Sequence, residues 1–232
     1  MSKVRSLNNA PTKTESHATG TPSLNSVSII GSGKVGRTLA RRLATLGYAV
    51  VVGSRQPTEK GRHTDLQHGN IRVTEIPVAL DAAPICVLAI PWKNCVSFAE
   101  QFSPWNDKIL VDCSNPLNST FDGLEVGHLT SAAEEIAKVA QGARVVKALN
   151  TASVEVMGDP RFGDSPATMF FCGDDDQAKQ IVASLLAALG FTPIDCGQLN
   201  QARNLEPLAM LYIHLAVRRG FGSNFGFTTL RR

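Results

Sequence analysis

The sequence lacks the features that mark several large classes of protein. No apolar run in its 232 residues approaches the roughly 20 residues that a membrane-spanning helix needs. The formal net charge is only +3, and the basic residues form no block interleaved with aromatic side chains, as nucleic-acid binding would favour. We therefore expect neither a membrane nor a nucleic acid among its partners.

Cysteine is also scarce, with five residues and no Cys-x-x-Cys pair. An odd, scattered set of cysteines, several of them in apolar runs, is typical of buried free thiols in a reducing compartment. The first 25 residues are rich in Ser, Thr, Asn and Pro and lack the apolar segment of a secretory signal. We therefore expect residues 1–25 to form a disordered leader and the protein to be cytoplasmic.

Acid–base groups are few as well. The Tyr-x-x-x-Lys pattern of short-chain dehydrogenases is absent, and of the five histidines only His128 lies where it could approach a substrate. Lys147 lies in a strand-like run and could be catalytic, but a lysine in such a place is more often structural, so no catalytic residue is identified. The three acids from Asp174 to Asp176 fit the start of a helix better than a metal site, and no metal is predicted.

The clearest feature that is present is a glycine motif between a strand pattern and a helix pattern. It follows the apolar run Val27–Ile30 and opens the helical pattern Lys34–Leu46. The motif is a complete G-x-G-x-x-G formed by Gly31, Ser32, Gly33, Lys34, Val35 and Gly36. Its first glycine allows a tight turn, its second lets the backbone approach a pyrophosphate, and its third lets the helix pack closely. The motif predicts a dinucleotide site at a helix N-terminus.

The next strand pattern indicates which dinucleotide is bound. The run Tyr48–Val52 is followed by Gly53, Ser54 and Arg55, in the place where an NAD site usually has Asp or Glu. A cation and a hydroxyl group suit a 2′-phosphate. We therefore expect NADP as the cofactor.

Strand and helix patterns alternate along the rest of the chain. They predict an α/β fold of the Rossmann type, with a doubly wound, mostly parallel sheet, helices on both faces and a short C-terminal α/β extension from about residue 165. Residues 26–232 are expected to form this single domain. A last helix over about Arg203 to Arg219 is expected to bury Leu208, Leu211 and Leu215. The other expected strands cover residues 71–73, 84–90, 109–112, 145–149, 169–172 and 191–194.

Three strand ends bring proline and asparagine to the carboxyl edge of this sheet, where a nicotinamide is expected. They read Ala89-Ile90-Pro91-Trp92, Cys113-Ser114-Asn115-Pro116 and Ala148-Leu149-Asn150-Thr151. We expect Ala89, Ile90 and Pro91 to line the site, and Asn115 and Asn150 to bond a carboxamide or a ring carbonyl. The lack of a base suits hydride transfer to a second ring cofactor, which depends on stacking and orientation.

Several stretches, in order along the chain, resemble one family. They are Gly31–Gly36, Leu43–Gly47, Val52–Arg55, Ile90–Trp92, Val111–Pro116, Val145–Asn150, Cys172–Asp176, and Ala202-Arg203 with Glu206. On these stretches the chain resembles the NADPH-dependent coenzyme F420 reductases and the related NADP-binding domain of six-transmembrane metalloreductases. The resemblance implies an NADP-binding fold, a homodimer, and contacts of Ser32, Ser54 and Arg55 with the 2′-phosphate.

The expected function is an NADPH-dependent oxidoreductase that transfers a hydride between NADP(H) and a flavin or a deazaflavin such as F420. Two alternatives stay open. One is an NADP-binding redox sensor or partner module without catalysis of its own. The other is a small dehydrogenase that acts on a carbonyl or alcohol substrate.

Overall fold

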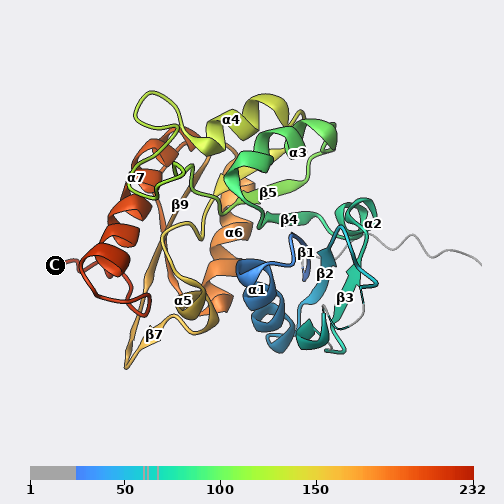
Figure 1. The fold of residues 1–232 in the computed structure, drawn as a ribbon, viewed down its shortest axis with the longest axis horizontal. Helices are drawn as coiled ribbons and strands as arrows, with labels where there is room; N and C mark the ends of the chain where they lie inside the picture. The colour runs from blue at the N-terminus through green and yellow to red at the C-terminus, as the bar shows by residue number, and fades with distance from the viewer. Residues whose placement is uncertain (1–24, 60, 62, 67) are drawn as a thin grey trace, which may run out of the picture.

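One twisted sheet runs through the molecule. The structure, a computed structural model, describes residues 25–59, 61, 63–66 and 68–232. The leader predicted for residues 1–25 lies, except for Asn25, outside the described residues. Within them, eight strands pair in the order β10-β9-β6-β5-β4-β1-β2-β3 (Figure 1).

The first six strands along the chain pair in parallel, which confirms the predicted Rossmann-type fold. They are β1 (Ser26–Ile30), β2 (Ala49–Gly53), β3 (Ile71–Thr74), β4 (Ile85–Leu88), β5 (Ile109–Asp112) and β6 (Arg144–Lys147). The C-terminal part adds β9 (Thr168–Gly173), which is antiparallel to β6, and β10 (Thr192–Asp195), which is parallel to β9. A separate small hairpin consists of β7 (Arg161–Phe162) and β8 (Ser165–Pro166).

Helices cover both faces of the sheet, and each face has its own hydrophobic cluster. On one face lie α1 (Lys34–Thr45), α5 (Val154–Gly158) and α6 (Asp176–Leu189). On the other lie α2 (Ile76–Ala82), α3 (Cys95–Gln101), α4 (Ala132–Val139) and α7 (Ala202–Ile213), which continues as a π-helical turn over His214–Arg218. Short 3₁₀ turns cover Thr64–Leu66, Trp92–Asn94 and Leu199–Gln201. None of the helices in the described residues is both long and apolar enough to cross a bilayer.

The order of the strands explains where a ligand can enter. Strand β1 pairs with β2 on one side and with β4 on the other, so the chain winds away from it in both directions. In such sheets a crevice opens at the carboxyl ends of the two central strands. Strands β4 and β5 are buried at every position, as central parallel strands are expected to be. The fold therefore places the glycine motif and the strand ends at one edge.

Two helix predictions need correction. Helix α1 ends at Thr45, and Leu46 is 37% exposed because it lies beyond the last turn, followed by Gly47 at φ +87°. Helix α7 and the turn after it do not bury the three predicted leucines: Leu211 is 48% exposed, and Leu208 and Leu215 are only partly buried. The buried side of α7 instead presents Ala202, Leu205, Glu206, Ala209 and Tyr212. The small alanines let this helix lie close to the sheet, and the helical period then turns Leu211 toward solvent.

Candidate functional site

The glycine turn after β1 is held by close backbone contacts. Gly31 has φ +113°, and a Cβ atom there would lie 2.3 Å from the carbonyl oxygen of Ala89. A Cβ atom on Gly36 would lie 1.9 Å from the carbonyl oxygen of Gly31. The Gly31 N–H donates to Gly53 O at 3.1 Å, which ties the turn to the end of β2. Two of the three glycines are therefore required by the fold itself.

Gly33 differs from its two neighbours in the motif. It is exposed, it precedes the first residue of α1, and a Cβ atom there would meet nothing within 4 Å. The N-terminus of α1 has no side-chain cap and no acid in its first turn. The first N–H groups of a helix have no partner within the helix and attract anions. The open space beside Gly33 therefore fits a pyrophosphate.

A cleft of about 470 Å³ extends from this turn across the ends of β1, β2 and β4. It brings together eight of the predicted site residues, namely Gly31, Ser32, Gly33, Ser54, Arg55, Ala89, Ile90 and Pro91. Sequence reasoning missed the walls that α2 supplies through Ile76, that α3 supplies through Ser97, Phe98 and Gln101, and that the 3₁₀ turn before α3 supplies through Asn94. We call this space the dinucleotide cleft. Lys34, Val35 and Gly36 lie in the first turn of α1 and are not among its lining residues.

The end of β2 carries the groups expected near a 2′-phosphate. Ser54 is buried, and its hydroxyl accepts from the Gln56 N–H at 3.2 Å. Arg55 is exposed at the mouth of the dinucleotide cleft. Arg37 donates to Ser32 O at 2.7 Å and pairs with Asp65, which secures the Ser32 backbone from the α1 side. The end of β2 thus offers the buried hydroxyl group of Ser54 and the exposed cation of Arg55, and β2 itself contains no acid.

A second cleft, of about 520 Å³, adjoins the first and shares Ile90 and Pro91 with it. Trp92 and Phe121 contribute aromatic rings, and Ser114 and Asn115 contribute polar groups from the turn after β5. Its other lining residues are Lys93, Leu117, Asn118, Ser119 and Glu125. We call this space the second cleft. Most of it comes from the long connection between β5 and α4, and connections of this length without helices or strands are often binding loops.

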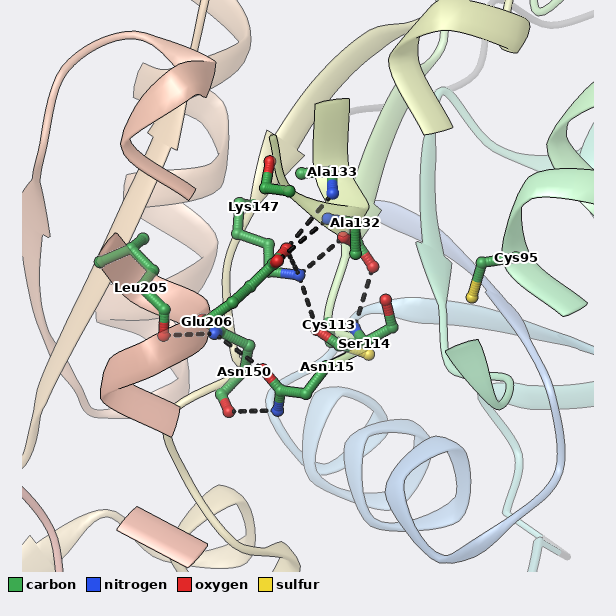
Figure 2. Close-up of polar contacts among 12 residues, drawn as sticks. Cys95, Cys113, Ser114, Asn115, Ala132, Ala133, Lys147, Asn150, Leu205 and Glu206 are labelled. Atoms are coloured by element: carbon green, nitrogen blue, oxygen red, sulfur yellow. Dashed lines mark hydrogen bonds and ion pairs between the residues drawn. The ribbon is translucent and has the colours of Figure 1, made fainter. Parts of the chain in front are cut away.

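The two predicted asparagines lie together but differ in exposure. Asn115 lines the second cleft, whereas Asn150 is 5% exposed and lies behind it, against α7. Asn115 Nδ2 donates to Asn150 O at 2.9 Å, and Asn150 Nδ2 donates to Asn115 Oδ1 at 3.1 Å and to Leu205 O at 3.0 Å (Figure 2). In this structure the two amides bind each other and the helix.

The sequence missed a fully buried ionic cluster beside this pair. Lys147 Nζ lies 2.8 Å from both Asp112 Oδ2 and Glu206 Oε1, and all three side chains are 0% exposed (Figure 2). Burial lowers the pKa of Lys147, but the two carboxylates outweigh it, so the pKa is raised and the ammonium stays charged. One signal was present, because Asp112 and Lys147 end two adjacent apolar strands.

The cysteine and histidine side chains are not placed for acid–base work in either cleft. Burial raises the pKa of Cys86 and of Cys113 to about 12, so these thiols stay protonated. His128 lines neither cleft. Together with His214 of the π-helical turn it lines a third pocket of about 580 Å³, which shares Phe121 and Glu125 with the second cleft. No histidine or cysteine therefore lines the second cleft in the described residues, and its ionisable lining side chains are Lys93 and Glu125.

The three consecutive acids act locally at α6. Asp174 Oδ1 accepts from Leu199 N at 2.9 Å, Asp175 Oδ1 accepts from Ala178 N at 2.6 Å, and Asp176 pairs with Lys179 at 3.1 Å. Only Asp176 lies in the first turn, because Asp175 is the N-cap and Asp174 precedes it. Across the described residues, no three His, Cys, Asp or Glu side chains gather as a metal site requires.

Comparison with known proteins places this geometry in one family. Residues 26–116 match the family described as NADP oxidoreductase, coenzyme F420-dependent. A crystal structure from Arthrobacter sp. FB24, named provisionally as an F420-dependent NADP reductase, is 31% identical with a TM-score of 0.80, over 88% of this chain and 99% of that one.

Curated relatives include F420-dependent NADP reductases and metalloreductases. The F420-dependent NADP reductase of Methanothermobacter thermautotrophicus is 29% identical over 81% of this chain and 87% of its own length. The metalloreductase STEAP3 of Rattus norvegicus is 36% identical over 80% of this chain. The chain spans only 37% of that metalloreductase, so the likeness concerns one part of the larger protein.

Proposed function

The chain belongs to the family of coenzyme F420-dependent NADP oxidoreductases, and from that premise we propose that it is an NADPH-dependent reductase whose acceptor is a flavin or deazaflavin ring. The observation that carries this proposal is the junction of the two clefts. The dinucleotide cleft and the second cleft share the Ile90–Pro91 strand end, where a nicotinamide is expected. A ring bound in the second cleft would therefore lie against the hydride donor.

The cofactor would be held by the residues that line the dinucleotide cleft. The backbone around Gly33 and the N-terminus of α1 would bind the pyrophosphate, and Ser32, Ser54 and Arg55 would bind the 2′-phosphate. When bound, NADPH supplies the hydride. The residues Ile90 and Pro91 would position the nicotinamide face toward the second cleft and keep water from it.

The second cleft suits a planar acceptor. Trp92 and Phe121 offer ring faces or edges for stacking, and Asn115 can bond ring carbonyl or imide groups at the cleft wall. No protein base is needed, since a reduced flavin or deazaflavin takes its proton from solvent after it receives the hydride. This agrees with the position of His128 away from both clefts.

The decisive experiment measures NADPH oxidation by the purified protein with FMN, coenzyme F420 or ferric citrate as the acceptor. The proposal expects turnover with one of the two ring acceptors. Turnover with ferric citrate alone, without added flavin, would favour direct metal reduction, the chemistry that the name of the STEAP3 relative suggests. Tight NADPH binding without any turnover would favour a sensor or partner module.

One substitution tests the alternative that the protein is a dehydrogenase with His128 as its general base. If a carbonyl or alcohol were the substrate, a general base would be required, and its loss usually costs about a hundredfold or more. We expect His128→Ala to retain turnover within about tenfold, with His214→Ala as the matched control in the same pocket. A collapse of turnover in His128→Ala with NADPH binding intact would contradict the ring acceptor.

We further propose that the protein works as a homodimer in the cytoplasm, as the family resemblance implied. Apolar side chains exposed along α7, the π-helical turn and the residues after it support an interface, with Leu211 48%, Val217 72% and Phe221 62% exposed. Sedimentation of the wild type and of Val217→Asp tests this. A wild-type protein that sediments as a monomer at micromolar concentration would rule out the homodimer.

A further inference from the structure

The buried cluster at the carboxyl ends of β5 and β6 makes more contacts than an ion pair needs. Lys147 Nζ donates to Asp112 Oδ2 at 2.8 Å and also to Ser114 O at 2.6 Å, the main-chain oxygen of the turn after β5 (Figure 2). On the other side of the same turn, the Ser114 N–H donates to Asp112 Oδ1 at 2.9 Å. Both main-chain polar groups of Ser114 are therefore held by one buried ion pair.

Glu206 has a different task in the cluster. Its Oε2 accepts from Ala132 N at 2.9 Å and its Oε1 accepts from Ala133 N at 3.3 Å, so this carboxylate caps the N-terminus of α4. Burial raises the pKa of Glu206, and the neighbouring Lys147 acts against that effect. Asp112 thus holds the turn, and Glu206 holds the helix.

Stability alone is a weak reason for such a cluster. A buried lysine with two carboxylates has to be desolvated, and apolar residues of similar volume often stabilise a core as well or better. What apolar residues cannot do is fix a carbonyl oxygen and an N–H group at set positions. The turn fixed here continues directly into Asn115, which lines the second cleft beside Ile90 and Pro91.

We propose that the buried Asp112–Lys147 pair positions the Ser114–Asn115 turn so that the second cleft can accept its ring ligand. Neither residue touches that cleft, so both are positioning residues rather than catalytic ones. This role rests on the function proposed above. It assigns acceptor recognition, and not NADPH binding, to a charge pair in the core.

Two isosteric substitutions separate this role from a structural one. A carboxamide has one acceptor oxygen where a carboxylate has two, so Asp112→Asn can serve either Lys147 Nζ or the Ser114 N–H, but not both. Glu206→Gln likewise keeps one acceptor oxygen, which at the Oε1 position can serve Lys147 and the Ala133 N–H but leaves the Ala132 N–H without its acceptor. Both variants remove one buried carboxylate next to Lys147. Lys147→Met is less informative, because it leaves two buried carboxylates without their cation and endangers folding.

The full-length wild type and both variants are compared in NADPH affinity, in KM for FMN or coenzyme F420, whichever the wild type reduces, and in melting temperature. We expect Asp112→Asn to raise the acceptor KM by about tenfold or more while NADPH affinity changes by less than about threefold. Glu206→Gln should lower the melting temperature similarly but change the acceptor KM by less than about threefold. Equal changes of the acceptor KM in both variants, or an unchanged KM in Asp112→Asn, would overturn the proposal.

A second measurement keeps this test separate from the proposed function. Hydrogen exchange of the free protein reports the Ser114 amide without any acceptor. Asp112→Asn should accelerate exchange in residues 113–117 and leave residues 132–135 protected, and Glu206→Gln should do the reverse. If the wild type reduces none of the acceptors, the proposed function fails, and this exchange pattern alone decides whether Asp112 holds the turn. The same exchange in both variants would show that it does not.

Discussion

Asn115 and Asn150 bind each other through two hydrogen bonds that join the turn after β5 to the turn after β6. Asn115 Nδ2 lies 2.9 Å from Asn150 O, and Asn150 Nδ2 lies 3.1 Å from Asn115 Oδ1. Because Asn150 also donates to Leu205 O at 3.0 Å, this pair connects the second cleft to α7. The pair therefore supports the wall of the second cleft at Asn115 on the side that faces α7.

Asn150→Leu should harm the second cleft more than the dinucleotide cleft. The change removes two hydrogen bonds and leaves Leu205 O and Asn115 Oδ1 without these donors, at a cost of about 1–3 kcal/mol for each buried group left unsatisfied. We expect a lower melting temperature and a reduced turnover, with NADPH affinity little changed. Asn204→Leu, at an exposed position on α7, is the control. Equal effects of the two variants would contradict the role of the pair.

Arg55→Ala should weaken NADPH binding selectively. The lost charge-assisted contact with the 2′-phosphate is worth about 1.5–3 kcal/mol, or roughly tenfold to a hundredfold in affinity. Calorimetric titration should show NADH affinity nearly unchanged. Arg72→Ala removes the same charge from an exposed position on β3 that does not line the dinucleotide cleft. If Arg55→Ala loses NADH and NADPH equally, the 2′-phosphate lies elsewhere.

Two valine substitutions within the glycine motif should have opposite consequences. Gly33→Val places its side chain in open space where the pyrophosphate is expected, so cofactor binding should be lost while the fold is kept. Gly36→Val places a Cβ atom 1.9 Å from Gly31 O, so the protein should unfold or melt much earlier. Circular dichroism melts and NADPH titration distinguish the two. NADPH affinity that survives Gly33→Val would move the phosphates away from this turn.

The ion pair between Arg203 of α7 and Glu134 of α4 should make the free energy of unfolding depend on pH. Arg203 donates to both oxygens of Glu134, at 2.9 Å and 2.6 Å, and holds the pKa of that carboxyl below its usual value. Stability from a lowered carboxyl pKa is complete above the unfolded value, near 4.3, and is lost as pH falls through the folded value. Arg203→Gln should therefore cost about 0.5–1 kcal/mol at neutral pH and progressively less below about pH 4.

Urea unfolding at several pH values measures this difference. Arg219→Gln, an exposed charge beyond the π-helical turn, should show no such pH dependence. A stability difference between wild type and Arg203→Gln that stays constant from neutral to acid pH would exclude the ion pair as its source.

Local patterns in the sequence predicted the Rossmann half well. The glycine motif was recognised from its spacing, and the apolar runs of β1 to β6 were recognised from their periodicity. The seven-residue helices α2 and α3 contain too few turns for a clear period, so the walls they give the dinucleotide cleft were missed. The prediction of which side of α7 is buried was wrong, because the small residues on its buried side contribute little to the hydrophobic pattern.

The ionic cluster could not be predicted in the same way. Lys147 is separated from Asp112 by 35 residues, and Glu206 from Ala132 by 74. Their pairing depends on strand order and on how α7 returns across the sheet, which a single sequence does not reveal. The sequence feature that indicates such a pairing is a charged residue on an otherwise apolar helix face, such as Glu206 between Leu205 and Ala209.

Because Glu206 caps α4, part of the contacts around α4 can form only after α7 has been translated. During synthesis β1 to β6 leave the ribosome first and can pair with one another as they emerge. The first amides of α4, however, wait for a carboxylate that is translated 74 residues after Ala132. Until then Lys147 has Asp112 as its only carboxylate within the cluster, and Asn150 lacks the carbonyl of Leu205. The edge that carries the second cleft thus stays incomplete until α7 has been translated, and a nascent chain that ends before α7 lacks these contacts.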